Sequence, residues 1–189
     1  LSLVRGAGKQ PAAFFDRDGI LNVDTGYPHR PEDLTLIPGA AQAVKTAKAL
    51  GYLTVVVTNQ SGVARGLFNE SDVRRFNDSL ICALAAAVEI NPTDNETATL
   101  IDAIYVCPYH PDATVEHYRC DHPDRKPNPG MIERAISDLS ITRAGSFLVG
   151  DKSSDIQAAE RAGIVGYLFN GENLFDFLSP IFSKLTAER

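Results

Sequence analysis

The sequence has no tryptophan, one methionine and three cysteines, and it lacks any apolar run of about 18 residues, the length that crosses a bilayer. It also lacks a block rich in lysine and arginine. Its 18 basic residues stand against 24 acidic ones, which gives a net charge of −6. We therefore expect no membrane span and no surface for nucleic acid or an anionic membrane. An anionic substrate must then be held by a few placed cations and backbone N–H groups.

The three cysteines indicate the redox environment of the chain. Cys82, Cys107 and Cys120 cannot all pair with one another, and Cys82 lies in an apolar stretch that is typical of a core. The first residues lack the basic flank and apolar centre of a signal peptide. These features predict a reducing, cytoplasmic location.

The size and composition are those of a soluble globular protein. The chain has 189 residues, of which 44% are hydrophobic and 22% charged, and this excludes disordered and fibrous classes. It contains no internal repeat, low-complexity tract or linker. We expect a single domain over residues 1–189 and a monomer.

Short apolar runs alternate with helical patterns along the chain. The predicted strands cover residues 11–15, 52–57, 101–106, 146–149 and 165–169. The predicted helices cover residues 38–50, 69–88, 130–139 and 154–162, with a turn-rich segment at 91–97. This alternation predicts an α/β fold with a Rossmann-like, doubly wound parallel sheet and helices on both faces. No insertion is long enough for a large cap domain.

Acidic residues follow two of the predicted strands. Asp16 and Asp18 come after the first strand, and Asp151 follows the fourth. The carboxyl ends of parallel strands meet at one edge of the sheet, where ligands bind. Alone, the Asp-x-Asp-Gly segment is equally compatible with a capped turn. A third carboxylate at this edge favours a site, because the three would repel one another without a cation among them, and Mg²⁺ prefers such oxygen ligands.

These residues suit phosphoryl chemistry. A carboxylate such as that of Asp16 can attack phosphorus to form an aspartyl-phosphate, which water then hydrolyses. Asp18 could protonate the leaving oxygen and later deprotonate the water. Thr58, with the backbone N–H groups that follow it, and Lys126 would contact the phosphoryl oxygens. Lys126 could instead be a solvated loop lysine, but its Arg-Lys-Pro-Asn-Pro-Gly segment is rigid and leads into a helix.

Four segments, taken in order, resemble the motifs of haloacid dehalogenase (HAD) superfamily phosphatases. They are FFDRDG at 14–19, VTNQSG at 57–62, RKP at 125–127 and GDKSSD at 150–155. One such motif is a weak indication, whereas four in order after the expected elements are a strong one. The resemblance spans residues 12–169. One departure is Ile20, where these enzymes usually have threonine.

Within this superfamily the chain is most similar to the phosphatases of D-glycero-D-manno-heptose 1,7-bisphosphate. The similar segments are LNVDTGY at 21–27, Arg65-Gly66 and CPYHP at 107–111. The resemblance implies a Mg²⁺-dependent enzyme that removes the C7 phosphate through an aspartyl-phosphate. Histidinol-phosphate phosphatases are near relatives, so that substrate, or another small phosphomonoester, is the alternative. An open site without a cap has little apolar wall for an imidazole, which favours the sugar.

The resemblance also implies roles for individual residues. Asp16 would be the nucleophile and Asp18 the acid/base, and both would bind Mg²⁺ with Asp151, Asp18 through its backbone carbonyl. Asp155 would support these ligands from behind. Thr58 and Lys126 would contact the phosphoryl group. The residues expected to bind the substrate are Arg17, Asn22, Asp24, Asn59, Gln60, Ser61, Arg125 and Lys152.

A proline-rich loop at 108–129 has its own expected role. Four potential zinc ligands lie in it or at its start: Cys107, His110, Cys120 and His122. Two Cys and two His can close a tetrahedral structural Zn²⁺ site. The related phosphatases resemble this with Cys-x-His followed by Cys-x-Cys, but here Tyr109 takes the first histidine position and the second pair is Cys-x-His. The alternative is a zinc-free loop packed by Tyr109, Tyr118 and the prolines.

Two further readings of the function stay open at this point. A catalytically inactive module of the same fold that senses phosphate or binds a partner is one, since fold does not determine function. Such a module would be expected to have lost Asp16 or Asp18, and both are present. Phosphoryl transfer to an acceptor other than water is the other.

Overall fold

The computed structural model describes residues 9–89 and 99–187, so the turn expected at 91–97 lies outside the described residues. The strands are β1 (Gln10–Phe15), β2 (Leu53–Asn59), β3 (Ala103–Cys107), β4 (Ile141–Gly150) and β5 (Val165–Leu168). The α-helices are α1 (Ala40–Ala49), α2 (Ser61–Ala64), α3 (Glu70–Ala87), α4 (Gly130–Asp138), α5 (Ser153–Arg161) and α6 (Leu174–Ala187). Two short 3₁₀ helices are η1 (Pro31–Asp33) and η2 (Glu116–Tyr118).

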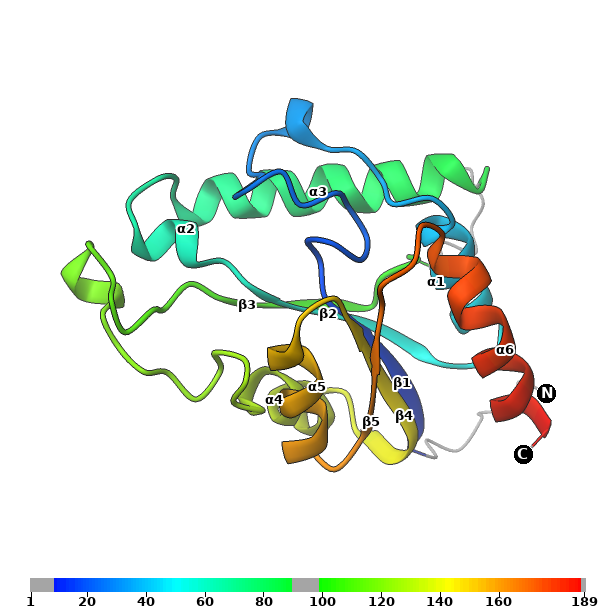
Figure 1. The fold of residues 1–189 in the computed structure, drawn as a ribbon. Helices are drawn as coiled ribbons and strands as arrows, with labels where there is room; N and C mark the ends of the chain where they lie inside the picture. Colours follow the sequence, from blue (N-terminus) through cyan, green and yellow to red (C-terminus); the bar gives the residue numbers. More distant parts are fainter. Residues whose placement is uncertain (1–8, 90–98, 188–189) are drawn as a thin grey trace, which may run out of the picture.

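The five strands form one parallel sheet in the order β3-β2-β1-β4-β5 (Figure 1). The chain builds outward from β1 to β3 and then returns to place β4 on the other side of β1. The predicted doubly wound architecture is thereby confirmed. A ligand crevice is expected where the order reverses, beyond the carboxyl ends of β1 and β4. These are the strands that Asp16 and Asp151 follow.

Alternate side chains of β1 enter two different hydrophobic cores. Ala13 and Phe15 pack with residues of α1, α3 and α6 on one face of the sheet. Ala12 and Phe14 pack with residues of α4 and α5 on the other face. Ile20 is fully buried in the first core, so the apolar residue at this family position adds to the packing. Because β1 is enclosed on both faces, the residue that follows it is held firmly in place.

Three elements differ most from the sequence prediction, and one of them is the short helix α2, where no helix is predicted. β4 begins at Ile141 rather than at 146, because Ile141 and Thr142 also pair with β1 before an irregularity shifts the register. Helix α6 is not predicted at all. Its N-terminus is capped by Asn173, whose Oδ1 accepts the backbone N–H groups of the second and third residues of the helix. Its apolar face then packs on α1.

Three loops surround the carboxyl edge of the sheet: residues 22–31, residues 60–69 around α2, and residues 108–129 around η2. The last two are joined, because the Val115 N–H donates to the Ala64 carbonyl (2.9 Å). Within residues 9–89 and 99–187 no large cap domain is present at this edge. No helix of the described residues is long and apolar enough to cross a membrane.

Candidate active site

Asp16 occupies the centre of the carboxyl edge. Its backbone N–H donates to the Val149 carbonyl of β4 (2.9 Å), which holds it between the two strands. Oxygens of Asp16, Asp151 and Asp155 all lie within 4.8 Å of one another. Burial raises the pKa of Asp16 from 3.8 to about 6; Lys126 opposes this rise and Asp155 adds to it. The site therefore concentrates negative charge in a place with little access to water.

Lys126 is the buried counter-charge of this cluster, and Lys152 Nζ lies 3.8 Å from Asp151 Oδ2 at its edge. Its side chain is 3% exposed, and its Nζ lies 2.8 Å from Asp16 Oδ1 and 2.6 Å from Asp155 Oδ1. The third contact of Nζ is the Val57 carbonyl, at 2.9 Å. Burial alone would lower the pKa of Lys126, but the two carboxylates outweigh it and the pKa is raised. Lys126 is thus a buried, charged group of the site and not a solvated loop lysine.

The carboxylate cluster fits a divalent cation. Asp151 Oδ1 is buried and accepts no hydrogen bond, and burial raises the pKa of Asp151. Asp151 can approach so closely because residue 19 is glycine: a Cβ at Gly19 would lie 2.5 Å from Asp151 Oδ2. The structure thus brings together Asp16 and Asp151, two of the three predicted ligands, and adds Asp155. The predicted use of the Asp18 backbone carbonyl stays a prediction.

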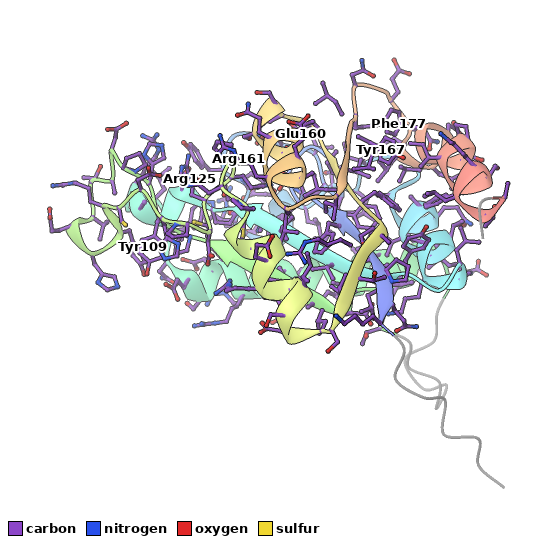
Figure 2. The ribbon with its side chains drawn as sticks, turned by 90° about the horizontal axis from the view of Figure 1, so that it is seen from below. Tyr109, Arg125, Glu160, Arg161, Tyr167 and Phe177 are labelled. Atoms are coloured by element: carbon purple, nitrogen blue, oxygen red, sulfur yellow. The ribbon has the colours of Figure 1, made fainter. Side chains whose placement is uncertain are left out.

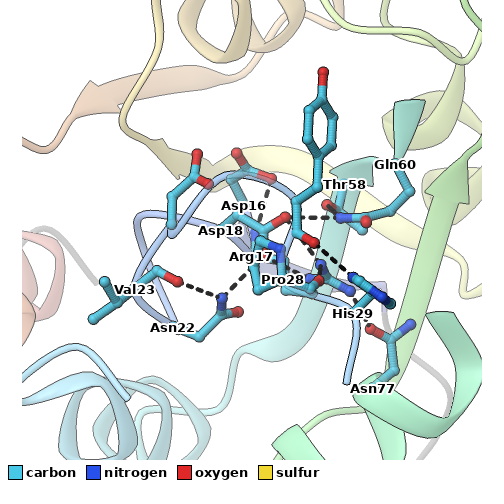
Figure 3. Close-up of polar contacts among 12 residues, drawn as sticks. Asp16, Arg17, Asp18, Asn22, Val23, Pro28, His29, Thr58, Gln60 and Asn77 are labelled. Atoms are coloured by element: carbon cyan, nitrogen blue, oxygen red, sulfur yellow. Dashed lines mark hydrogen bonds and ion pairs between the residues drawn. The ribbon is translucent and has the colours of Figure 1, made fainter. Parts of the chain in front are cut away.

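The Asp18 carboxylate is surrounded by donors (Figure 3). Arg17 donates to both oxygens, from Nε to Oδ1 and from Nη2 to Oδ2, each at 2.9 Å. Asn22 Nδ2 donates to Oδ1 and Gln60 Nε2 to Oδ2, again at 2.9 Å. All four contacts hold Asp18 in one orientation beside Asp16.

Two predicted substrate-binding residues have a different place in the structure. Arg17 and Asn22 are both 0% exposed, and their N–H groups donate to Asp18, to backbone carbonyls and, from Arg17, to Asn77 Oδ1. Direct contact of these two side chains with substrate stays a prediction. The turn after β1 folds inward and encloses both of them. Their position makes them supports of Asp18.

The segment after β2 links Thr58 to the other site residues. Gln60 Nε2 donates to both Thr58 Oγ1 (2.9 Å) and Asp18 Oδ2, which leaves the Thr58 hydroxyl proton for another acceptor. The Asn59 carboxamide exchanges two hydrogen bonds with the Lys126 backbone (3.0 and 3.1 Å). The Gln60 N–H, expected on a phosphoryl oxygen, instead donates to the Cys107 carbonyl (2.8 Å). That prediction is corrected, while substrate contact by the side chains of Asn59 and Gln60 stays a prediction.

A cavity of about 580 Å³ opens beside Asp18 and Lys126. It is lined by Asp18, Asp24, Gly26, Tyr27, Asn59, Gln60, Ser61, Arg125, Lys126, Pro127, Lys152 and Ser154. Lys152 Nζ pairs with Asp24 Oδ2 (3.2 Å) and so joins two loops at the rim. Arg125 Nη1 donates to the Tyr109 carbonyl (3.1 Å), a contact within the loop at 108–129 that holds the arginine at the rim (Figure 2). Asp24, Ser61, Arg125 and Lys152 thus lie where the sequence predicts substrate contacts.

Known proteins are similar to this chain over nearly its whole length. A family model described as "HAD-hyrolase-like" matches residues 124–172, which include Lys126, Asp151 and Asp155. A D-glycero-beta-D-manno-heptose-1,7-bisphosphate 7-phosphatase of Rhodopseudomonas palustris is 38% identical over 181 residues, which cover 95% of this chain and 94% of that protein. The chain belongs to the HAD phosphatase family. It is an enzyme of the phosphoric monoester hydrolase class.

Other relatives of this HAD phosphatase differ in the anomer that their names give. A Burkholderia mallei protein named as D-glycero-alpha-D-manno-heptose-1,7-bisphosphate 7-phosphatase is 41% identical over 156 residues, covering 82% of this chain and 77% of that protein. A solved structure, the D,D-heptose 1,7-bisphosphate phosphatase of B. bronchiseptica complexed with magnesium and phosphate, has a TM-score of 0.74 at 28% identity. The match covers 95% of this chain and 100% of that one.

The predicted zinc ligands of this HAD phosphatase are not assembled. Among the described residues, the cluster of Asp16, Asp151 and Asp155 is the only group of three or more potential metal ligands, so Cys107, His110, Cys120 and His122 form none. The physical reasons are local. Cys107 is buried in an apolar core, and the His122 ring stacks on Tyr109 with ring centres 4.2 Å apart. Tyr109 also contacts Tyr118, as the zinc-free alternative predicts. The residues present do not fit a tetrahedral zinc ion.

Proposed function

We propose that this enzyme removes the C7 phosphate of D-glycero-D-manno-heptose 1,7-bisphosphate and leaves the 1-phosphate. The observation that carries the proposal is the likeness, over 95% of the chain, to a relative that bears the name of this activity. The geometry supports it, because a carboxylate cluster with one buried lysine lies beneath an open cavity that has arginine and lysine at its rim.

The first step is transfer of the phosphoryl group to the enzyme. An Asp16 carboxylate oxygen attacks phosphorus, the bond from phosphorus to the C7 oxygen breaks, and Asp18 gives its proton to that oxygen. Lys126 and the Thr58 hydroxyl stabilise the phosphoryl oxygens as charge builds up. Asp16, Asp151 and Asp155 would hold a Mg²⁺ ion, which would supply the positive charge that lets these carboxylates and a phosphate dianion coexist.

The second step restores the enzyme. Asp18 takes a proton from water, the water oxygen attacks phosphorus, and the bond from phosphorus to Asp16 breaks to release phosphate. The same carboxyl group thus gives a proton in one step and takes one in the next, which requires a fixed position between the leaving oxygen and the water. Arg17, Asn22 and Gln60 provide that position.

Recognition of the sugar falls to the rim of the cavity. Arg125 can bind the second phosphate with two parallel hydrogen bonds, a geometry that a lysine does not offer. Lys152 adds a second cation, and Asp24, paired with it, can accept hydrogen bonds from sugar hydroxyls. We propose a monomer that works in a reducing cytoplasm, for which the three free cysteines and the acidic composition are the support.

The test is a comparison of substrates at saturating Mg²⁺. Phosphate release is measured with both anomers of the heptose bisphosphate and with histidinol phosphate, and the substrates are ranked by kcat/KM. We expect a heptose bisphosphate to rank first, and nuclear magnetic resonance of the product to show the 1-phosphate. A higher kcat/KM for histidinol phosphate would replace the proposed substrate with that one. Retention of the phosphate on an organic acceptor would make the enzyme a transferase.

A further inference from the structure

Arg17 is a fully buried arginine whose contacts divide between the active site and helix α3. On one side its guanidinium holds both oxygens of Asp18, and its Nη2 also donates to the Pro28 carbonyl (3.0 Å). On the other side its Nη1 donates to Asn77 Oδ1 (3.1 Å). The Phe76 ring lies against the guanidinium, with its centre 4.4 Å from Cζ. Arg17 therefore connects α3 to the acid/base through direct contacts.

Asn77 is an unusual residue in its place on α3. The buried residues of this helix are Val73, Phe76, Asn77, Leu80 and Leu84. Their spacing is that of one inward-facing stripe, and all members except Asn77 are apolar. A carboxamide that is 7% exposed is costly in such a stripe unless it is hydrogen-bonded. The partner that it has is Arg17, 60 residues away along the chain.

We propose that Asn77 and Phe76 are positioning residues for the acid/base: by fixing the Arg17 guanidinium, they fix the Asp18 carboxylate. This inference rests on the proposed role of Asp18. A guanidinium is planar, so its Nη1 contact and its two-point contact with Asp18 turn together. Loss of the Asn77 acceptor leaves a buried N–H without a partner, and the group must rotate or shift to find another. Proton transfer is sensitive to such displacements, which are small on the scale of a hydrogen bond.

The test separates proton donation from every other effect of the substitution. In Asn77→Leu the acceptor is lost while the side chain keeps a similar size. kcat/KM is measured for the heptose bisphosphate, whose alkoxide needs a proton, and for 2,4-dinitrophenyl phosphate, whose phenolate leaves without one. Both values report steps up to formation of the phosphoenzyme. We expect kcat/KM to fall about tenfold or more with the sugar and less than about threefold with the aryl ester.

Three variants serve as controls. Asp18→Asn should also lose more kcat/KM with the sugar than with the aryl ester, and the difference should be larger. Asn77→Asp restores an acceptor oxygen and should recover most of the loss with the sugar. Asp78→Ala changes the exposed neighbour on the same helix and should not change the ratio of the two kcat/KM values. If Asn77→Leu does not fold, Asn77→Ser gives the same test, because its hydroxyl is too short to reach Arg17.

The outcomes distinguish the inference from the function on which it rests. An equal loss on both substrates in the Asn77 variants would mean a merely structural role and overturn the inference. If Asp18→Asn loses more kcat/KM with the sugar than with the aryl ester and the Asn77 variants do not, the inference is overturned and the proposed reaction stays intact. If Asp18→Asn loses kcat/KM equally with both substrates, Asp18 is not the acid. Both the inference and the proposed proton transfer are then overturned.

Discussion

The Lys126 ammonium lies 2.8 Å from Asp16 Oδ1, so the proposed nucleophile has a positive partner that belongs to the chain itself. The same ammonium is 2.6 Å from Asp155 Oδ1, and neither carboxylate is neutralised fully by one shared charge. The site is therefore organised around an excess of negative charge. The second and third of the following predictions test what that excess does.

The first prediction concerns the nucleophile. Asp16→Asn should fold normally but lose nearly all turnover, because an amide of the same size does not attack phosphorus. Less than about a tenth of the wild-type kcat should remain, which corresponds to at least about 1.4 kcal/mol in the barrier. The measurement is phosphate release under saturating substrate, with circular dichroism as the check on folding. Retention of more activity than this would assign the nucleophile to another residue.

The second prediction is a pH dependence of stability in metal-free protein. The folded-state pKa of Asp16 is raised from 3.8 to about 6, so the folded protein holds this proton more tightly than the unfolded chain. Asp16 then costs stability as pH rises from about 4 to 6, and the full cost, about 3 kcal/mol, remains above pH 6. The free energy of unfolding of Asp16→Asn should equal that of the wild type near pH 3.5 and exceed it at pH 7.

Urea unfolding of both proteins in EDTA across this pH range gives the difference in the free energy of unfolding that is due to Asp16 and to the groups that interact with it. Adding Mg²⁺ at pH 7 should stabilise the wild type and so reduce the difference in the free energy of unfolding between the two proteins. A difference that stays constant with pH would show that burial does not raise the pKa of Asp16.

The third prediction concerns the metal. EDTA should abolish activity and Mg²⁺ should restore it, because Asp16, Asp151 and Asp155 crowd one place and Asp151 Oδ1 has no hydrogen-bond donor. Mg²⁺ should raise the Tm of the wild type, and it should do so less for Asp151→Asn. Full turnover in the presence of EDTA would contradict the assignment of the cluster as a cation site.

The fourth prediction is a zinc-free loop. Elemental analysis of protein purified without chelator should find well under one zinc per chain, because the residues around Cys107 and His122 are packed and not arranged as ligands. Tyr109→Ala should increase protease cleavage within 108–129, since it removes the ring that stacks on His122. Tyr105→Phe, which keeps its ring and loses an exposed hydrogen bond to Asp138, is the control. Stoichiometric zinc would refute the prediction.

The fifth prediction separates recognition from chemistry. Arg125→Met should raise KM for the heptose bisphosphate about tenfold or more and change KM for p-nitrophenyl phosphate little, because only the larger substrate reaches the rim. Arg125 also contacts the Tyr109 carbonyl. A parallel rise in both KM values would therefore indicate a displaced loop and not a lost phosphate contact.

The parts of the fold that sequence reasoning predicts well are those with strong local patterns. β1 and β2 are continuous apolar runs that end at polar residues, so both the strands and the edge that carries Asp16 and Thr58 could be located. Helix α6 also has a readable pattern: Asn173 caps it, and Leu174, Leu178 and Phe182 recur every four residues. It lies beyond the segment that the family motifs cover, and those motifs contain no information about it.

The supports of Asp18 could not be predicted, for a physical reason. A charged residue between two aspartates reads as solvent-exposed, and nothing local to Arg17 shows that the turn buries it. The only indication is remote, since Asn77 interrupts the apolar stripe of α3. Pairing the two requires the tertiary structure. The zinc prediction fails in a similar way, because residue types in one loop do not determine which way each side chain turns.

The absence of a large cap over the described part of the chain has a consequence for the pace and the evolution of the enzyme. An enzyme with a folded lid must open it before product leaves, and that motion can limit turnover. Here the loops at the cavity are in contact with one another through Val115 and Ala64 and through the stacked rings of His29 and Phe68, and the Gln60 N–H anchors one of them to the end of β3. Product can leave without a domain movement. New substrates can be accommodated by exchanging loop residues, while the strands that carry the chemistry stay as they are.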